Sequence, residues 1–241
     1  MMKTLKEIFG VEKPIIGMLH MTGLNLGERM VFAKEEIEIM YRCGVDAVLV
    51  ENYFGDAVDV EHALQYLQKE YTDKVYGINM LGDPDLAFEL ARKYGAKFVQ
   101  IDSVCGHLPL DRDAEYADYI KKLRGDGDIF LMGGVRFKHT PYQSGRSLEE
   151  DLHIATGRCD AIVVTGAGTG IETKLEKIKS FRDALSDFPL IVGAGVTAET
   201  AAQQLAYTDG AIVGTGFKEL GITEYPVDEE QVEKLLHNAR K

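Results

Sequence analysis

Short runs of β-branched and other apolar residues alternate along the whole chain with longer stretches in which apolar residues recur every three or four positions. The first pattern is typical of a buried strand, and the second has the period of a helix with one buried face. Their regular alternation indicates βα units, in which helices connect and cover parallel strands. Eight strands are predicted, at residues 14–20, 46–52, 75–81, 98–103, 129–135, 161–165, 190–193 and 211–214.

Helices are predicted between these strands and after the last one. Several have recognisable ends: Ser147 is followed three residues later by Glu150, which is the pattern of a capping box. Gly44, Gly95 and Gly157 stand where a helix would end in a left-handed residue. The predicted helices are residues 30–43, 60–71, 86–94, 116–123, 148–156, 175–185, 198–205 and 232–237.

Eight βα units are compatible with a closed barrel or with an open, doubly wound sheet. The length of 241 residues is close to that of a (β/α)8 barrel. A dinucleotide-binding sheet should carry G-x-G-x-x-G after its first strand, whereas here the first strand ends in His20-Met21-Thr22-Gly23. We therefore predict an α/β fold, a (β/α)8 TIM barrel, as a single domain over residues 1–241.

Composition and charge exclude several classes of protein. The net charge of −12 argues against a nucleic-acid partner, because phosphate backbones are bound by clustered Lys and Arg. Residues 1–9 carry charges and no apolar core of the length of a signal peptide, and no segment approaches the roughly 20 apolar residues of a membrane span. Three scattered cysteines suit a reducing compartment. We expect a cytoplasmic protein without membrane insertion.

Polar residues stand at the predicted carboxyl ends of successive strands, where barrels carry their functional groups. Glu51 follows an apolar run and should be partly desolvated, which raises a carboxyl pKa toward neutrality and suits a general acid or base. The alternative is a structural carboxylate paired with Lys138 or Arg136. Asp102 could share acid and base roles with Glu51, or bind a divalent ion together with Asn79.

Two further strand-end residues have open roles. Lys138 could form a Schiff base, act as an electrostatic clamp for an oxyanion, or pair with a carboxylate, and the clamp is favoured. His20 could relay protons or be a hydrogen-bonded core histidine. The sequence contains no H-E-x-x-H motif and no Cys/His cluster, so we predict no metal site and no cofactor, while a divalent ion at the carboxylates stays open.

Glycine-rich loops after the last two strands are the most specific signal. Gly193 and Gly195 follow the seventh strand, and Gly214, Thr215 and Gly216 follow the eighth. Loops at these positions form the usual phosphate site of barrels, because glycines let backbone N–H groups approach an anion. The competing interpretation is that they are only turn glycines. A third loop, at Gly166, adds donors or forms a flexible lid.

Several blocks of the chain together resemble the BtpA/SgcQ family. They lie at residues 14–20, 44–52, 55–56, 77–81, 137–139, 162–166, 169–170, 192–197, 209–218 and 226–228. The resemblance implies a phosphate-binding-type barrel but no settled reaction, because the family is named after a role in photosystem I biogenesis while other members look like parts of sugar-uptake or catabolic gene sets. Where the family reads Ala-Asp-Val in strand five, this chain has Gly133-Gly134-Val135 and lacks the carboxylate. A looser similarity is to the tryptophan synthase α subunit.

These observations favour a lyase or isomerase that acts by acid/base chemistry on a phosphorylated, sugar-like small molecule. Glu51 and Asp102 would move protons, while Lys138 and Asn79 would stabilise developing negative charge. One alternative is a non-catalytic accessory factor of the photosystem I biogenesis type. Another is a glycosidase or nucleosidase that uses Glu51 and Asp102. The sequence leaves a homo-oligomer open.

Overall fold

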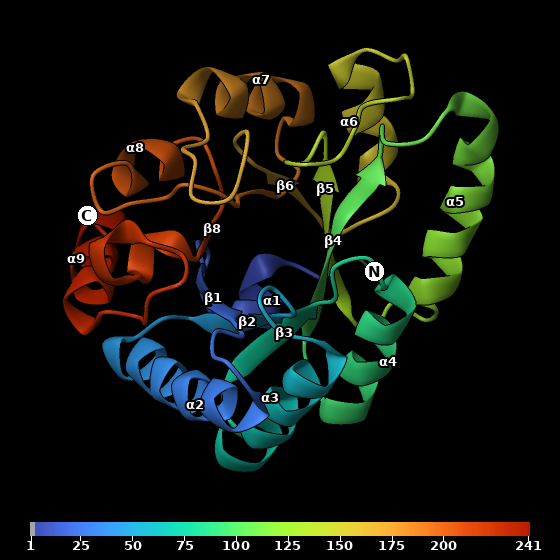
Figure 1. The fold of residues 1–241 in the computed structure, drawn as a ribbon. Coiled ribbons are helices and arrows are strands. Elements are labelled where there is room, and N and C mark those ends of the chain that lie inside the picture. Colours follow the sequence, from blue (N-terminus) through green and yellow to red (C-terminus); the bar gives the residue numbers. More distant parts are fainter. Residues whose placement is uncertain (1–2) are drawn as a thin grey trace.

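Eight parallel strands close into a ring in chain order in the computed structural model, which describes residues 3–241. Figure 1 shows the helices arranged around the strands in the same order. The predicted (β/α)8 barrel is therefore confirmed. Met1 and Met2, which begin the segment interpreted as lacking a signal peptide, lie outside the described residues. Among the described residues, no helix has both the length and the apolar character needed to cross a bilayer.

All eight predicted strands are present, with bounds that differ by a few residues. The strands are β1 (Ile15–His20), β2 (Ala47–Glu51), β3 (Val75–Asn79), β4 (Phe98–Cys105), β5 (Phe130–Val135), β6 (Ala161–Val164), β7 (Leu190–Val192) and β8 (Ala211–Val213). The helices are α1 (Leu5–Phe9), α2 (Leu26–Cys43), α3 (Ala57–Glu70), α4 (Pro84–Tyr94), α5 (Leu110–Arg124), α6 (Leu148–Thr156), α7 (Leu175–Leu185), α8 (Ala201–Leu205) and α9 (Glu229–Ala239), with 3₁₀ turns η1 (Thr215–Phe217) and η2 (Glu219–Gly221).

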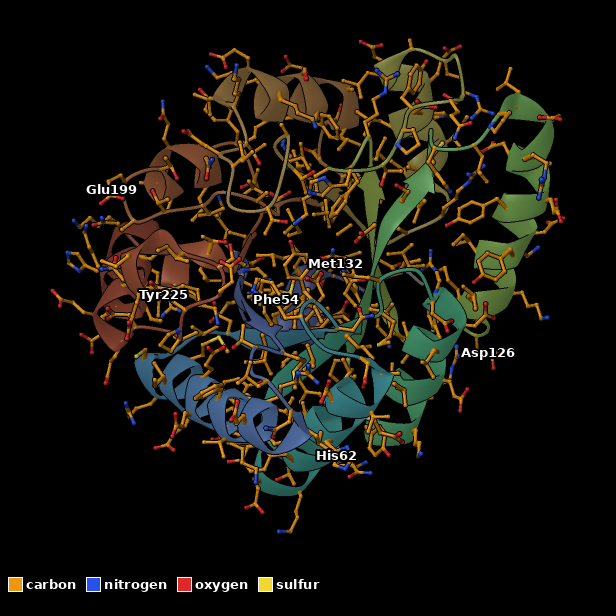
Figure 2. All side chains as sticks on the ribbon, in the orientation of Figure 1. Phe54, His62, Asp126, Met132, Glu199 and Tyr225 are labelled. Carbon is orange, nitrogen blue, oxygen red and sulfur yellow. The ribbon has the colours of Figure 1, made fainter. Side chains whose placement is uncertain are left out.

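The barrel interior is filled by alternate residues of the strands, because successive side chains of a strand point to opposite faces. The inward-facing residues form one apolar cluster that is separate from the layer between strands and helices. Met132 of β5 belongs to this interior and lies near the middle of the ring in Figure 2, whereas His62 and Glu199 lie on the outside. Leu5 and Phe9 of α1 belong to the same cluster, so this short helix closes the amino end of the barrel.

The local sequence signals predicted most of these helix ends correctly, but not all of them. Ser147 and Glu150 form the predicted capping box, and Gly44 and Gly95 are left-handed as expected. The prediction for Gly157 was wrong: its φ is −81°, so this helix ends without a left-handed residue. Helix α5 begins six residues before its predicted start, because its first residues are mostly polar, its one early leucine, Leu110, is exposed, and the apolar period is missing there.

Candidate active site

Four polar side chains end the inward-facing rows of β1 to β4. In β2, Ala47 and Leu49 face the barrel interior, and the two-residue period of the strand places Glu51 in the same row. The inward-facing rows of β1 and β4 likewise begin with apolar interior residues, Ile16 and Phe98. The polar layer at the carboxyl end of the barrel consists of His20, Glu51, Asn79 and Asp102. All of these were candidate residues from the sequence.

Asn79 joins the two carboxyl groups of this layer. Its side-chain Nδ2 donates to Oε1 of Glu51 over 2.8 Å and to Oδ1 of Asp102 over 3.1 Å, so these two oxygens lie within about 6 Å of each other. An amide nitrogen has two hydrogens, and both are used here. Asn79 therefore orients the carboxyl groups, and its donors are not free for the expected stabilisation of charge on a ligand.

Burial changes the protonation of both carboxyl groups. Desolvation, together with the nearby charge of Asp102, raises the pKa of Glu51 to about 7, although Lys138 and the bond from Asn79 oppose the shift. Desolvation also raises the pKa of Asp102, against hydrogen bonds from Asn79 and Gln100. Glu51 is thus near half-ionised at neutral pH, the condition in which a carboxyl group can both accept and release a proton.

The surroundings of His20 bear on both roles considered for it from the sequence. Burial, reinforced by the charges of Lys218 and Lys138, lowers its pKa to about 3, so the ring is neutral at physiological pH. Its Nε2 lies 3.7 Å from Oε2 of Glu51, and its Nδ1 has no hydrogen-bond partner among the described residues. A neutral imidazole in this position offers a ligand one hydrogen-bond donor or acceptor, and not a positive charge.

Lys138 reaches over the mouth of the barrel from the loop after β5. Its Nζ donates to Oγ1 of Thr169 over 3.1 Å, and its charge lowers the pKa values of Glu51 and Asp102 without the contact of an ion pair. Arg136 pairs instead with Asp151, at 3.3 Å, so the alternative of a Glu51–Arg136 pair is wrong. Lys138 is therefore placed to attract an anion at the mouth.

The glycine loops after β7 and β8 meet beside Lys138 and His20 around a small cavity of about 30 Å³, which we call the glycine-loop pocket. Its volume suits a group of a few atoms and not a whole metabolite. Most of the predicted phosphate-binding residues line it, and the loop after β6 contributes Thr169 and Gly170, which were not among those predicted residues. The lining includes Met18, Thr169, Gly170, Gly193, Gly195, Gly214, Thr215 and Gly216.

Individual glycines of these loops have different roles. Gly195 has a φ of +62°, and a Cβ there would lie 2.3 Å from the backbone of Glu172, so only glycine fits. Within the described residues, the amides of Gly195 and Gly214 donate to no protein acceptor and are free for an anion. The amide of Gly193 is not free, because it donates to the carbonyl of Val164 over 2.8 Å. Gly166 packs against its own loop and does not line the pocket.

A buried ion pair anchors the loop after β8. Nζ of Lys218 contacts both carboxylate oxygens of Glu36, on α2, at 2.7 Å, and Lys218 is almost completely buried. This pair was not predicted, because Glu36 lies in a helix whose other charged residues are mostly exposed. The helix expected at residue 198 begins at Ala201 and has five residues, so the glycine loops, and not a long helix, shape the pocket.

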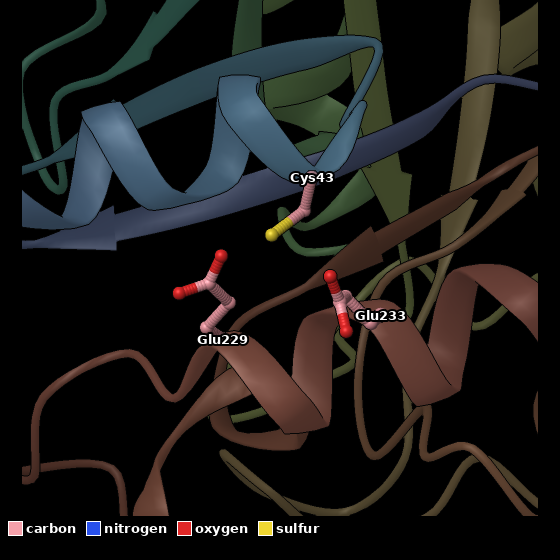
Figure 3. Close-up of side chains that lie close together, drawn as sticks. All are labelled: Cys43, Glu229 and Glu233. Atoms are coloured by element: carbon pink, nitrogen blue, oxygen red, sulfur yellow. The ribbon is translucent and has the colours of Figure 1, made fainter.

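Other hollows and clusters lie away from the mouth. A larger cavity of about 540 Å³ is lined by residues such as Lys3, Arg124 and Asp160, at the amino end of the strands. Among the described residues, ligand atoms of Cys43, Glu229 and Glu233 lie within 4.8 Å of one another, between the end of α2 and α9 (Figure 3). The two glutamates are exposed, and Glu229 already pairs with Arg42, so this cluster is unrelated to the mouth.

Comparison with other proteins relates almost the whole chain to one family. A model of the BtpA family matches residues 11–241. An uncharacterized protein of Archaeoglobus fulgidus is 30% identical and covers 95% of this chain and 100% of its own. The sgc region protein SgcQ of Escherichia coli is 25% identical over the full length of both chains. The photosystem I biogenesis protein BtpA of Synechocystis sp. is 25% identical over 96% of this chain and 90% of its own.

Solved structures with the same fold have much lower sequence identity. A structure of native KDPGal superposes with a TM-score of 0.66 at 17% identity, over 95% of this chain and 96% of that one. Phosphoribosyl anthranilate isomerase from Thermococcus kodakaraensis superposes with a TM-score of 0.62 at 15% identity, over 95% and 99% of the two chains. At these identities the likeness establishes the barrel fold alone.

Proposed function

The chain belongs to the BtpA family, and from that premise we propose that it is a lyase or isomerase that acts by acid/base chemistry on a phosphorylated, sugar-like molecule. One observation carries the proposal: a pocket of free amides is lined by Lys138 and His20, and the His20 ring lies 3.7 Å from the buried carboxyl group of Glu51, whose pKa is raised to about 7. The named isomerase among the structural neighbours acts on a phosphoribosyl compound, which is consistent with this assignment.

The parts of the site divide the work of this reaction, and Lys138 contributes to two steps. The amides of Gly195 and Gly214, with the charge of Lys138, bind the phosphate in the glycine-loop pocket. Glu51 removes a proton from the bound carbon skeleton and returns it, and Asp102 serves as its partner acid. Lys138 stabilises the negative charge that develops on the substrate oxygen as the proton leaves.

Anion binding at the glycine-loop pocket tests the first half of the proposal. Thermal-shift and calorimetric titrations with inorganic phosphate should show stabilisation that grows with the logarithm of phosphate concentration. Thr215→Asp places a negative charge in the lining of the pocket and should abolish this response. Thr215→Val is the matched control, because it removes the bond to Thr223 without adding charge and should retain phosphate binding.

Two results would contradict the assignment. Phosphate that binds equally well to the wild type and to Thr215→Asp would place the anion elsewhere. A complete lack of response to inorganic phosphate and to sugar phosphates would leave the barrel as a scaffold and favour the accessory-factor alternative that the Synechocystis relative's name suggests.

A retaining glycosidase is the second candidate, and the spacing of the carboxyl groups favours it. The oxygens of Glu51 and Asp102 that Asn79 joins lie within about 6 Å, near the roughly 5–5.5 Å of retaining enzymes and below the ~6.5–9.5 Å of inverting ones. A glycosidase mechanism would not explain the free amides of the glycine-loop pocket or the Lys138 side chain beside them. Release of nitrophenol from nitrophenyl glycosides, lost in Glu51→Gln, would support this candidate over the first.

A further inference from the structure

A second cavity opens on the other side of the carboxyl pair. It has a volume of about 340 Å³ and lies between the loops that follow β3 and β4, and we call it the β3/β4 pocket. Asn79 and Asp102 belong to its lining. Its remaining lining residues are Met80, Leu81, Gly82, Pro84, Ile101, Ser103, His107, Tyr116 and Thr140.

The carboxyl pair connects the two pockets. His20 lines the glycine-loop pocket, and its ring lies 3.7 Å from Glu51. Glu51 is joined through Asn79 to Asp102, which lines the β3/β4 pocket. A ligand with its phosphate in the first pocket would therefore pass the acid/base groups on its way into the second.

Two polar groups of the β3/β4 pocket have no protein partner. The hydroxyl of Ser103 is buried, with the residue only 7% exposed, and makes no hydrogen bond among the described residues. Nδ1 of His107 is likewise buried and, by distance and angle, has no hydrogen-bond partner in the described part of the chain, while the same ring interacts with the backbone of Cys105 and packs edge-on against Tyr116. Buried polar atoms are normally hydrogen-bonded, and both residues line the cavity, so a polar ligand that enters it can complete the hydrogen bonding of these two side chains.

The character of the lining defines which polar groups fit. Within the part of the chain that is described, this pocket is lined by no Lys or Arg, in contrast to Lys138 in the glycine-loop pocket. Burial and the charge of Arg158 lower the pKa of His107, so its ring is neutral at pH 7. Met80, Leu81 and Pro84 add apolar surface to the lining of the same pocket. A second phosphate would lack a cation here, whereas a hydroxylated carbon chain would find both apolar surface and hydrogen-bond partners.

We infer that the β3/β4 pocket binds the uncharged, hydroxylated end of the substrate, and that the substrate is a sugar monophosphate and not a bisphosphate. Ser103 and His107 determine this specificity by hydrogen bonds to substrate hydroxyls. The inference rests on the proposed function, since it takes the glycine-loop pocket as the phosphate site. It adds the identity of the far end of the ligand and the residues that recognise it.

Calorimetric titrations of the full-length protein with four probes test this inference: inorganic phosphate, glycerol 3-phosphate, ribose 5-phosphate and ribulose 1,5-bisphosphate. Affinity should rise from inorganic phosphate to the pentose monophosphate, and the bisphosphate should bind no more tightly than the monophosphate. Ser103→Ala should weaken ribose 5-phosphate binding roughly three- to tenfold, the effect of one neutral hydrogen bond, and leave inorganic phosphate binding unchanged. His107→Phe, which keeps the packing on Tyr116, should act in the same way.

Stability measurements separate loss of recognition from loss of folding. Because the hydroxyl of Ser103 has no protein partner, Ser103→Ala should leave the melting temperature of the free protein unchanged. Ser180→Ala, which removes an exposed hydroxyl on α7, is the control and should change neither stability nor affinity.

The outcomes distinguish the two proposals. If neither inorganic phosphate nor any of the sugar phosphates binds, the proposed function itself is wrong. If phosphate binds but ribose 5-phosphate binds no tighter, or if Ser103→Ala and His107→Phe bind both probes like the wild type, the phosphate site stands and the β3/β4 pocket is not the sugar site. Tighter binding of the bisphosphate than of the monophosphate would likewise overturn the inference.

Discussion

Carboxylates at the two ends of the barrel are held in opposite ways. At the amino end, Asp46, Asp160 and Asp209 stand just before β2, β6 and β8, and each accepts a backbone N–H from the first or second residue of a neighbouring strand, over 2.8 to 2.9 Å. Each also pairs with an arginine. At the carboxyl end, Glu51 and Asp102 share one amide donor and contact no Lys or Arg within hydrogen-bond distance in the described residues.

This difference separates carboxylates that hold the fold from carboxylates available for chemistry. Each amino-end group accepts hydrogen bonds from both a strand N–H and an arginine side chain, which ties the start of a strand to the surrounding layer of the barrel. Glu51 is buried with an incomplete set of partners, which raises its pKa and costs stability. Strained or incompletely paired groups are typical of functional sites. The size of a cavity does not identify the candidate site in this barrel. The 540 Å³ cavity lies at the amino end, where the carboxylates are paired with arginines.

The largest expected difference between substitutions at the two ends of the barrel is in kcat. Glu51→Gln keeps the shape and the bond to Asn79 but cannot transfer a proton, so it should lower kcat by about 10²- to 10⁴-fold. Asp160→Asn, at the other end, should leave kcat per folded molecule unchanged. The measurement is steady-state kinetics on whichever sugar phosphate binds. Equal losses in the two variants would mean that Glu51 has no special role.

The free energy of unfolding should respond in the reverse order, with the large loss at the amino end of the barrel. Asp160→Ala removes the partner of Arg124 and leaves the amide of Leu131 unpaired, so the free energy of unfolding should fall by about 3 to 4 kcal/mol. Asp160→Asn retains an acceptor for Leu131 and should lose less. Urea denaturation followed by circular dichroism measures both. A loss in Asp160→Ala smaller than in Asp160→Asn would show that the backbone bond contributes little.

The pH dependence of stability should identify Glu51 as a destabilising group. Between pH 4.5 and 7 the unfolded chain releases the proton of Glu51 while the folded chain retains it, so stability falls as pH rises through this window. Glu51→Gln does not titrate and should be more stable than the wild type at pH 8, by up to about 3 kcal/mol, and nearly equal at pH 4.5. Unfolding curves at the two pH values give the difference. A constant difference would mean that the pKa of Glu51 is not raised.

The sequence predicted the barrel and the row of strand-end residues, because both follow from the two-residue period of strands and their parallel order. The role of Asn79 was not predictable, since its use of both hydrogens depends on how closely β2, β3 and β4 approach at the mouth. The Lys218–Glu36 pair joins residues 182 positions apart, and no local pattern marks such a contact. The β3/β4 pocket depends on loop shape, which the sequence pattern does not determine.

The smallest predicted effect is the loss of stability on removing Arg240, the ion-pair partner of Asp46. Asp46 accepts the amide of Ile15 and also contacts Arg240, whose side chain is 49% exposed. Exposed ion pairs contribute little, so Arg240→Ala should cost about 0.5 kcal/mol, whereas Asp46→Ala should cost more because it leaves the Ile15 amide without its acceptor. A double-mutant cycle by urea denaturation would measure the coupling between the two residues. Coupling larger than the loss in Asp46→Ala would show that the ion pair, and not the backbone bond, fixes the start of β1.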